Sequence, residues 1–333
     1  MNVSPENQTG TRTLSIGRTS HLATQLGVAE QHLKDLASRA SQDYIDFTRI
    51  VKGKQRRLVM AKPELAEVQK RILERLLMRL PPSEAAYGAI KGRSVKQNAA
   101  VHAASAFVAK LDIRAFYPNI HRKEVYQFFI SQECPPDVSR LLTLLTTHKH
   151  ALPLGASTSP MLADQIVRPI DIRLETMARQ ASLNYTRYVD DIAISGSYPL
   201  ERFTKLVLRI LEQYGFKVRP RKLIIYRPGD QKERIITGVR ISDGKVFAPL
   251  GFVAQLESDL RAAARQSRHS VLEGFFYSRQ HYRGRIAYVQ WLDADAGSGL
   301  VKLYRKVKWQ HLEWMMREAA PQPHRHTSEG NPT

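Results

Sequence analysis

The feature that most constrains how this chain can fold is an acidic pair, Asp190-Asp191, enclosed by apolar residues. Neighbouring residues on a strand point to opposite faces, so a pair that serves one site must occupy a turn between two strands. The segment 184–196 therefore predicts two short strands joined at an acidic turn. A further apolar run, residues 107–113, predicts a buried strand that carries Asp112 near its end.

These carboxylates favour a magnesium site. Acidic groups among apolar residues are costly unless a cation compensates them, and hard oxygen ligands from two strands suit Mg²⁺. Two such ions can activate a 3′-hydroxyl and stabilise a leaving pyrophosphate. Taken alone, however, an acidic pair is more simply interpreted as a polar hairpin turn.

The charge of the chain indicates a polyanionic partner. The 333 residues include 51 Lys and Arg against 31 Asp and Glu, a formal net charge of +20. A compact chain with this excess repels itself unless a polyanion neutralises it, so nucleic acid is the first partner to expect. Charge alone does not separate polymerases from nucleases, ribosomal proteins or membrane-surface proteins.

The sequence favours a cytoplasmic protein with no membrane association. Its single cysteine, Cys134, cannot form an intramolecular disulfide or a four-thiolate zinc site. The first residues have neither the basic nor the apolar region of a signal peptide. No uncharged apolar run approaches the roughly 18 residues that span a bilayer.

The order of the predicted elements indicates an α+β core followed by helices. Polar residues at both ends, up to about residue 20 and from Pro321 onward, predict loose arms. Apolar spacing and turn residues predict helices over 63–80, from about 123, after the loop 152–160, over 201–214, after Pro249 and over 300–317.

Three motifs, in this order along the chain, resemble those of the reverse transcriptases. LDIRAFYPNI (111–120) is similar to the family's aspartate strand, LPLGASTSP (152–160) to its LPQGAPTSP-type loop, and YVDD (188–191) to its YxDD box. An NAxxH element at 98–102 and a TG element at 237–238 resemble those of bacterial retron-type enzymes. The resemblance covers roughly residues 44 to 292.

The resemblance implies a right-hand polymerase fold with fingers, palm and helical thumb. The expected divisions are an N-terminal arm and helical extension (1–43), the first part of the fingers (44–105), the palm with an intervening fingers segment (106–240), the thumb (241–320) and a flexible tail (321–333).

The same resemblance assigns the catalytic and metal-binding residues. Asp112 and Asp190 would be the principal ligands of two Mg²⁺ ions, with Asp191 in support and Ile113 offering its backbone carbonyl. Tyr117 stands where the family has the aromatic residue that blocks a ribose 2′-hydroxyl. Phe116 is its rival for this role, and either aromatic could instead complete the palm core.

Further residues are expected to contact the nucleotide. Lys54 and Arg57 lie on a fingers hairpin whose basic side chains clamp the triphosphate in the family, although a basic hairpin is also simply a solvated turn. Lys222 resembles a palm lysine that helps to neutralise the triphosphate, and a surface role is equally open for it.

The loop 152–160 both follows and departs from the family pattern. Gly155 permits close approach of the backbone to nucleotide or template. Leu154 stands where most members have a glutamine that meets the nucleotide sugar. Nucleotide affinity, fidelity or template use is therefore expected to differ in this chain.

We therefore predict an RNA-directed DNA polymerase of retron type. Its expected partners are dNTPs, a structured non-coding RNA that serves as template, the single-stranded DNA product and an effector protein encoded nearby, in antiphage defence. Two alternatives are a defence enzyme with non-standard or template-independent synthesis and a catalytically inactive polymerase-like RNA-binding subunit. The intact carboxylates argue against the second alternative.

Overall fold

A computed structural model describes residues 13–51 and 54–318, and the predicted tail from residue 321 lies outside them. The chain divides into two compact units, Met1–Lys232 and Glu233–Thr333. Residues 233–240 therefore belong to the second unit, whereas the predicted palm extends to residue 240. In the described part of the chain, no helix combines the length and apolar character that a bilayer crossing requires.

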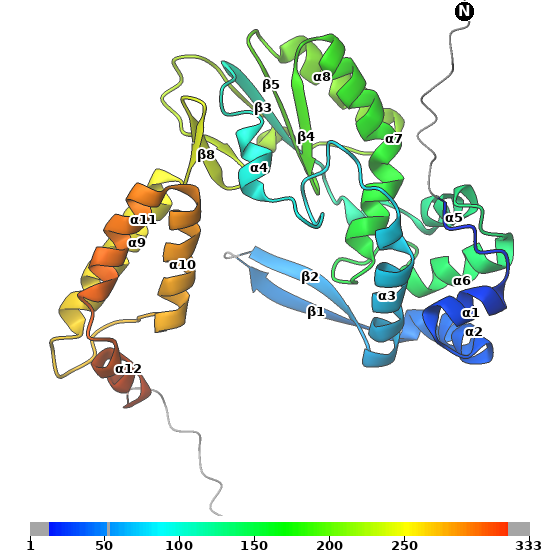
Figure 1. The fold of residues 1–333 in the computed structure, drawn as a ribbon, viewed down its shortest axis with the longest axis horizontal. Coiled ribbons are helices and arrows are strands. Elements are labelled where there is room, and N and C mark those ends of the chain that lie inside the picture. The colour runs from blue at the N-terminus through cyan, green and yellow to red at the C-terminus, as the bar shows by residue number, and fades with distance from the viewer. Residues whose placement is uncertain (1–12, 52–53, 319–333) are drawn as a thin grey trace, which may run out of the picture. The chain divides into compact units, whose positions relative to one another are not determined.

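The first unit joins a helical cluster, a two-stranded ribbon and a four-stranded sheet (Figure 1). Its helices are α1 (Thr19–Leu26), α2 (Glu30–Arg39), α3 (Pro63–Arg75), α4 (Val95–Ala100), α5 (Arg122–Ser131), α6 (Pro136–Thr146), α7 (Ser159–Gln180) and α8 (Glu201–Gln213). Its strands are β1 (Tyr44–Val51), β2 (Lys54–Ala61), β3 (Phe107–Asp112), β4 (Asn184–Tyr188), β5 (Asp191–Gly196) and β6 (Ile224–Tyr226).

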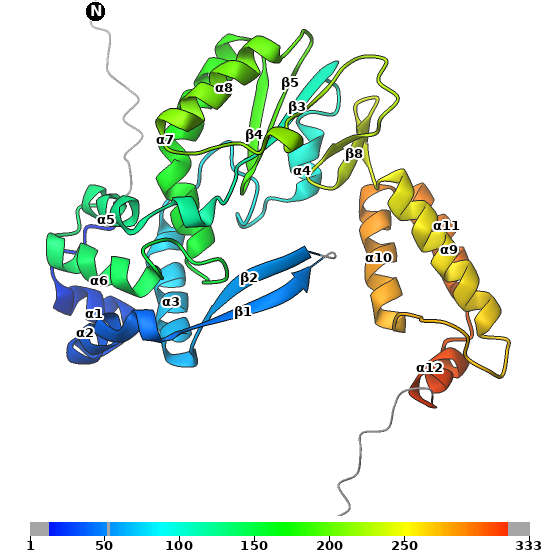
Figure 2. The same ribbon diagram turned by 180° about the vertical axis from the view of Figure 1, so that it is seen from behind.

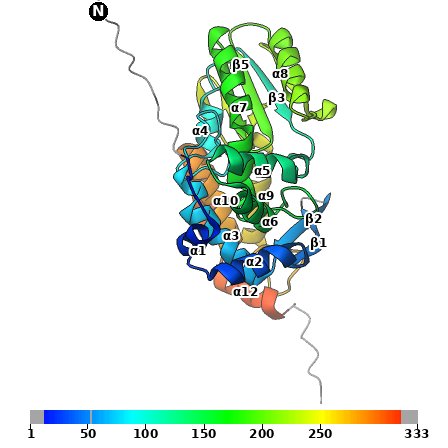
Figure 3. The same ribbon diagram turned by 90° about the vertical axis from the view of Figure 1, so that its right-hand side faces the viewer.

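The sheet has the antiparallel order β4-β5-β3-β6. Helices α7 and α8 lie on one face and α4 on the other (Figure 2). The face toward α7 and α8 is apolar because alternate residues of β3 and β5, such as Leu111 and Ile192, are buried against Ile170 and Val207. The β1–β2 ribbon extends from the helical cluster (Figure 3).

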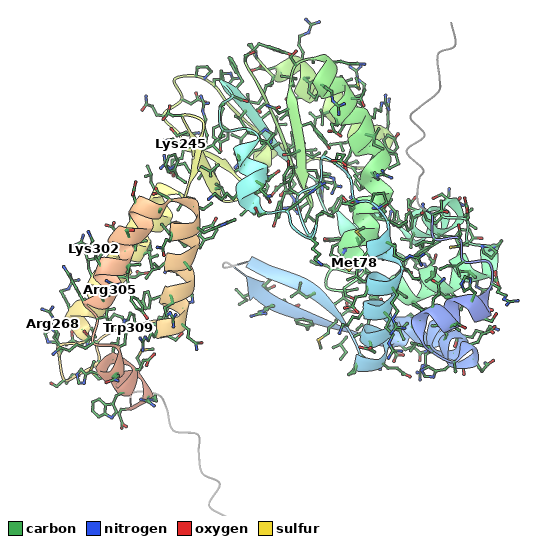
Figure 4. The ribbon with its side chains drawn as sticks, in the orientation of Figure 1. Met78, Lys245, Arg268, Lys302, Arg305 and Trp309 are labelled. Atoms are coloured by element: carbon green, nitrogen blue, oxygen red, sulfur yellow. The ribbon has the colours of Figure 1, made fainter. Side chains whose placement is uncertain are left out.

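The second unit combines a three-stranded antiparallel sheet with four helices among its described residues. The strands are β7 (Arg234–Ile236), β8 (Val239–Ser242) and β9 (Lys245–Phe247), and the helices are α9 (Leu250–Gln266), α10 (Arg279–Leu292), α11 (Ala294–Arg305) and α12 (Trp309–Glu318). Leu260, Val289 and Leu300 form part of its core. Arg268, Lys302 and Arg305 are exposed and lie along one side of this unit (Figure 4).

Two predicted helices differ from the observed ones. The helix expected over 63–80 ends at Arg75, and a 3-10 turn over Leu77–Arg79 follows, in which Leu77 is buried with the flanking Leu76 and Leu80 while Met78 is exposed. The basic helix expected over 300–317 is two helices, because the chain turns at 306–308 so that Val307 and Trp309 are both buried. The Trp309 indole donates a hydrogen bond to the Tyr304 carbonyl at 3.1 Å, which satisfies one acceptor at the end of α11.

Candidate active site

The acidic pair lies on a tight turn, as its sequence predicts. Tyr188 pairs with Asp191 across β4 and β5, so Val189 and Asp190 alone form the turn. Val189 has a φ of +58°, at a position where glycine is the usual residue in two-residue hairpins. The short turn brings both carboxylates to the same end of the sheet.

Asp112 joins the acidic pair through sheet register. It ends β3 directly opposite Asp191 on β5, and the Ile113 amide donates to the Asp190 carbonyl at 2.8 Å. The structure therefore brings together all four predicted metal-binding residues. Their roles as ligands stay a prediction.

Burial and mutual repulsion make these carboxylates hard to ionise. Burial, followed by the negative charge of Asp112, raises the pKa of Asp190. Burial and the charges of Asp190 and Asp112 raise the pKa of Asp191 to about 6. The site therefore favours the arrival of a cation, which would lower both pKa values.

Two cations from the segment after α8 hold Asp112. Lys222 pairs with Asp112 Oδ2, and Arg219 Nε lies 3.2 Å from Oδ1. The Arg219 amide also donates to the Asp112 carbonyl at 3.0 Å. Lys222 was predicted from sequence, whereas Arg219 was missed, although it lies three residues earlier in the same basic segment.

The residues present fit a hard divalent cation. Asp112 is only 5% exposed, and its Oδ1 atom has no hydrogen-bond partner among the described residues apart from the ion-pair contact with Arg219. Carboxylate oxygens of this kind are ligands that Mg²⁺ prefers. Within the described residues, no group of three acidic, His or Cys side chains is already gathered as a metal cluster.

The two candidate gate residues lie in different surroundings. Phe116 is buried, with its ring centroid 5.9 Å from that of Phe216. Tyr117 is only partly buried, and burial together with the Asp190 charge raises its pKa to about 12. Phe116 thus completes the core, whereas Tyr117 packs against that core and is also close enough to Asp190 for the aspartate charge to raise its pKa.

The loop before α7 supports the β1–β2 ribbon. The Leu154 carbonyl accepts a hydrogen bond from the Val59 amide at 3.0 Å. Gly155 has a φ of +132°, and a Cβ there would collide with the Val59 carbonyl. The close approach that this glycine permits is therefore, in this structure, an approach of β2. Contacts of Leu154 and Gly155 with a nucleotide remain predictions.

The backbones of Lys54 and Arg57 lie on β2, where Arg57 pairs with Thr48 of β1. Their side chains lie outside the described residues. The predicted triphosphate clamp therefore stays a prediction.

His102, in the NAxxH element, has a structural position. Its ring is buried against β4 and β5, 2.8 Å from Ser195 Oγ and 2.8 Å from Thr186 Oγ1. Burial lowers the pKa of His102 to about 3. The imidazole is therefore neutral in the folded protein near pH 7.

This burial predicts an acid-sensitive fold. In the unfolded chain His102 binds a proton below a pH of about 6.5, whereas in the folded chain it binds one only below about 3. The free energy of unfolding therefore falls as the pH drops from the first value to the second. Between pH 7.5 and 5.5 the loss from His102 should be about 1.4 kcal/mol. Denaturant unfolding should show a correspondingly smaller loss for His102→Gln, and parallel pH profiles would contradict this assignment.

Comparison with known proteins identifies the family of the chain. Residues 50–241 match the family described as reverse transcriptase (RNA-dependent DNA polymerase). The chain is 30% identical to the Retron Mx65 reverse transcriptase of Myxococcus xanthus, over 87% of this chain and 72% of that protein. It is 27% identical to the Retron Ec86 reverse transcriptase of Escherichia coli, over 86% and 87%.

Telomerase from Candida albicans, solved with a fragment of telomeric RNA, is a similar structure with a TM-score of 0.45 and 10% identity. The similarity covers 82% of this chain and 61% of the telomerase chain.

The sheet and its converging carboxylates, taken with the family match, define a nucleic-acid polymerase of the right-hand class. The chain belongs to the reverse transcriptases, which are RNA-directed DNA polymerases, and within them to the retron type. The predicted α+β fold class and enzyme class are confirmed.

Proposed function

We propose that this enzyme copies a structured non-coding RNA, encoded close to its own gene, into single-stranded DNA. Synthesis would use dNTPs in the cytoplasm and serve antiphage defence together with an effector protein encoded nearby. The observation that carries the catalytic part is the convergence of Asp112, Asp190 and Asp191 at one end of the sheet. The similarity to retron reverse transcriptases supports the choice of template.

The carboxylates would hold two Mg²⁺ ions. Asp112 and Asp190 are the principal ligands, with Asp191 and the Ile113 carbonyl in support. When bound, Mg²⁺ supplies charge stabilisation for attack of a 3′-hydroxyl and departure of pyrophosphate. Lys222, which pairs with Asp112, lies beside this site and would contact the triphosphate once Asp112 is a ligand.

The net charge supports an RNA partner. A charge of +20 gives affinity for any polyanion, and exposed cations such as Lys302 and Arg305 contribute to it. Phosphate contacts weaken steeply with salt, whereas recognition of loops and stacked bases depends on it less.

Sequencing of the bound nucleic acid tests the template. Enzyme purified from its host at about 0.5 M salt, where non-specific phosphate contacts are weak, should retain one dominant structured RNA and a short DNA copied from it. Recovery of heterogeneous RNA without copied DNA would defeat the retron-type template while leaving RNA-directed synthesis intact. DNA whose sequence matches no RNA in the sample would instead indicate template-independent synthesis.

Removal of the predicted gate should relax sugar selection. Tyr117→Ala is expected to raise the rNTP-to-dNTP ratio of kcat/KM by at least about tenfold, the equivalent of about 1.4 kcal/mol, because the side chain that would collide with a 2′-hydroxyl is gone. Single-nucleotide incorporation on a primed RNA template measures the ratio. Phe116→Ala is the matched control, and it should change folding more than sugar selection. An unchanged ratio in Tyr117→Ala would remove this residue from the gate.

A further inference from the structure

Arg187, immediately before the YVDD turn, is a buried cation. Its side chain is 2% exposed and faces α7, where Asp164 and Asp171 are spaced by two helical turns and therefore share a face. The guanidinium donates to both Asp171 carboxylate oxygens, at 2.9 Å from Nε and 2.7 Å from Nη2, and to Asp164 Oδ1 at 2.7 Å. Both acceptors are themselves buried.

The remaining arm of Arg187 reaches the catalytic turn. Nη1 donates to the Val189 carbonyl at 3.1 Å, and that carbonyl belongs to the peptide that leads into Asp190. The guanidinium thus connects the rigid helix α7 directly to the backbone of the turn.

The turn is strained where Arg187 holds it. Val189 is β-branched and has a φ of +58°, a conformation that such residues rarely adopt. Strained backbone of this kind persists only where its surroundings fix it.

The surroundings of Val189 include a second restraint. Gly88 packs so closely that a Cβ there would lie 2.6 Å from both the Val189 amide nitrogen and its Cγ2 atom. The segment with Gly88 is itself fixed to β4, because the Arg187 amide donates to Ala85 and the Tyr87 amide donates to the Arg187 carbonyl, at 2.8 and 2.7 Å. Arg187 therefore takes part in both of these restraints, through its side chain at the Val189 carbonyl and through its backbone at the segment with Gly88.

We propose that Arg187 is a positioning residue for DNA synthesis, which holds Val189 in its left-handed conformation and thereby keeps Asp190 and Asp191 facing Asp112. Asp164 and Asp171 orient the guanidinium. The Arg187 side chain is too deeply buried to meet a nucleotide or template directly, and the inference rests on the proposed roles of the carboxylates. A buried ion pair is weak grounds for a role in stability, whereas the bond to Val189 acts on the geometry of the site.

The test uses Arg187→Lys in the full-length enzyme on a primed RNA template. Lysine keeps the charge for Asp171 but lacks the planar fork that reaches Asp164 and Val189 together. We expect kcat to fall by about 10- to 100-fold while the KM for dNTP changes by less than about threefold, because positioning acts on the chemical step. Tyr185→Phe removes another hydrogen bond to Asp171 without touching the turn, so it is the matched control and should retain its kcat.

A second substitution separates positioning from general stability. Glycine adopts a positive φ without strain. The double variant Arg187→Lys/Val189→Gly should therefore have a kcat at least about fivefold higher than that of Arg187→Lys alone. A folded Arg187→Lys enzyme with normal kcat, or no recovery on adding Val189→Gly, would overturn the inference. If Arg187→Lys does not fold, Asp164→Asn, which removes one acceptor of the guanidinium, takes its place with the same expected results.

The two proposals fail in different ways. If Asp190→Ala abolishes synthesis while folded Arg187→Lys keeps its kcat, the carboxylate roles stand and only the positioning role is wrong. If Asp190→Ala remains active, the proposed catalytic roles fail before Arg187 is considered.

Discussion

Asp190→Ala is expected to abolish DNA synthesis, with a loss of at least about 10³-fold in kcat/KM. The loss of a metal-binding carboxylate removes several kcal/mol of transition-state stabilisation, and each 1.36 kcal/mol is about tenfold in rate. Asp112→Ala should behave in the same way because Asp112 lies in register with Asp191 beside the turn. Primer extension on an RNA template with Mg²⁺ measures the loss, and full synthesis by either variant would contradict the site.

The same substitution has a stability signature that does not depend on activity. Without divalent cations, burial and Asp112 raise the pKa of Asp190, which means that the ionised carboxylate is unfavourable in the fold. Asp190→Ala should therefore unfold at the same temperature as the native chain in EDTA, or higher.

Added Mg²⁺ should raise the midpoint of the native chain and leave that of Asp190→Ala unchanged, because only the native chain gains binding energy on folding. Asp137→Ala, at an exposed aspartate in the first turn of α6, is the matched control and should keep the Mg²⁺ response. A Mg²⁺ shift of equal size in Asp190→Ala would place the metal elsewhere.

The catalytic turn could be predicted from sequence because its information is local. The apolar flanks Tyr188-Val189 and Ile192-Ala193-Ile194 indicate the two strands, and the acidic pair between them leaves room only for a turn. The end of β3 follows in the same way from the apolar run before Asp112. The register that places Asp112 opposite Asp191 is a long-range property, and it was not predicted; the family resemblance supplied only the expectation that Asp112 and the acidic pair share one site.

Residues that act across the fold were harder to predict. Arg219 meets Asp112, and Arg187 meets Asp164 and Asp171, only after distant segments have packed. The usable signals were a charged residue between the two tyrosines of β4 and two aspartates spaced by seven residues on α7. The end of α3 was also mispredicted. The helical spacing of the leucines continues past Arg75, because a 3-10 turn buries leucines as an α-helix does.

Gly155→Ala is expected to detach the β1–β2 ribbon from the loop 152–160. The φ of +132° at Gly155 is essentially closed to other residues, and the new Cβ would meet the Val59 carbonyl. Strain of this kind costs about 1–3 kcal/mol. The least costly response is a local movement of β2, because unfolding would expose the whole core.

Hydrogen exchange at one amide reports this movement. The Val59 amide donates to the Leu154 carbonyl. If the whole strain energy weakens this hydrogen bond, the hydrogen exchange of the Val59 amide should accelerate about 5- to 150-fold. The kcat/KM for dNTP should fall within the same range, since the ribbon carries the predicted triphosphate clamp.

Gly17→Ala is the matched control for this substitution. A Cβ at Gly17 meets nothing within 4 Å, so both Val59 exchange and synthesis should stay at native levels. If Gly155→Ala accelerates Val59 exchange without lowering kcat/KM, the ribbon does not position the nucleotide. If exchange is unchanged and activity falls, Gly155 acts on a nucleotide or template directly, as its place in the loop 152–160 first indicated.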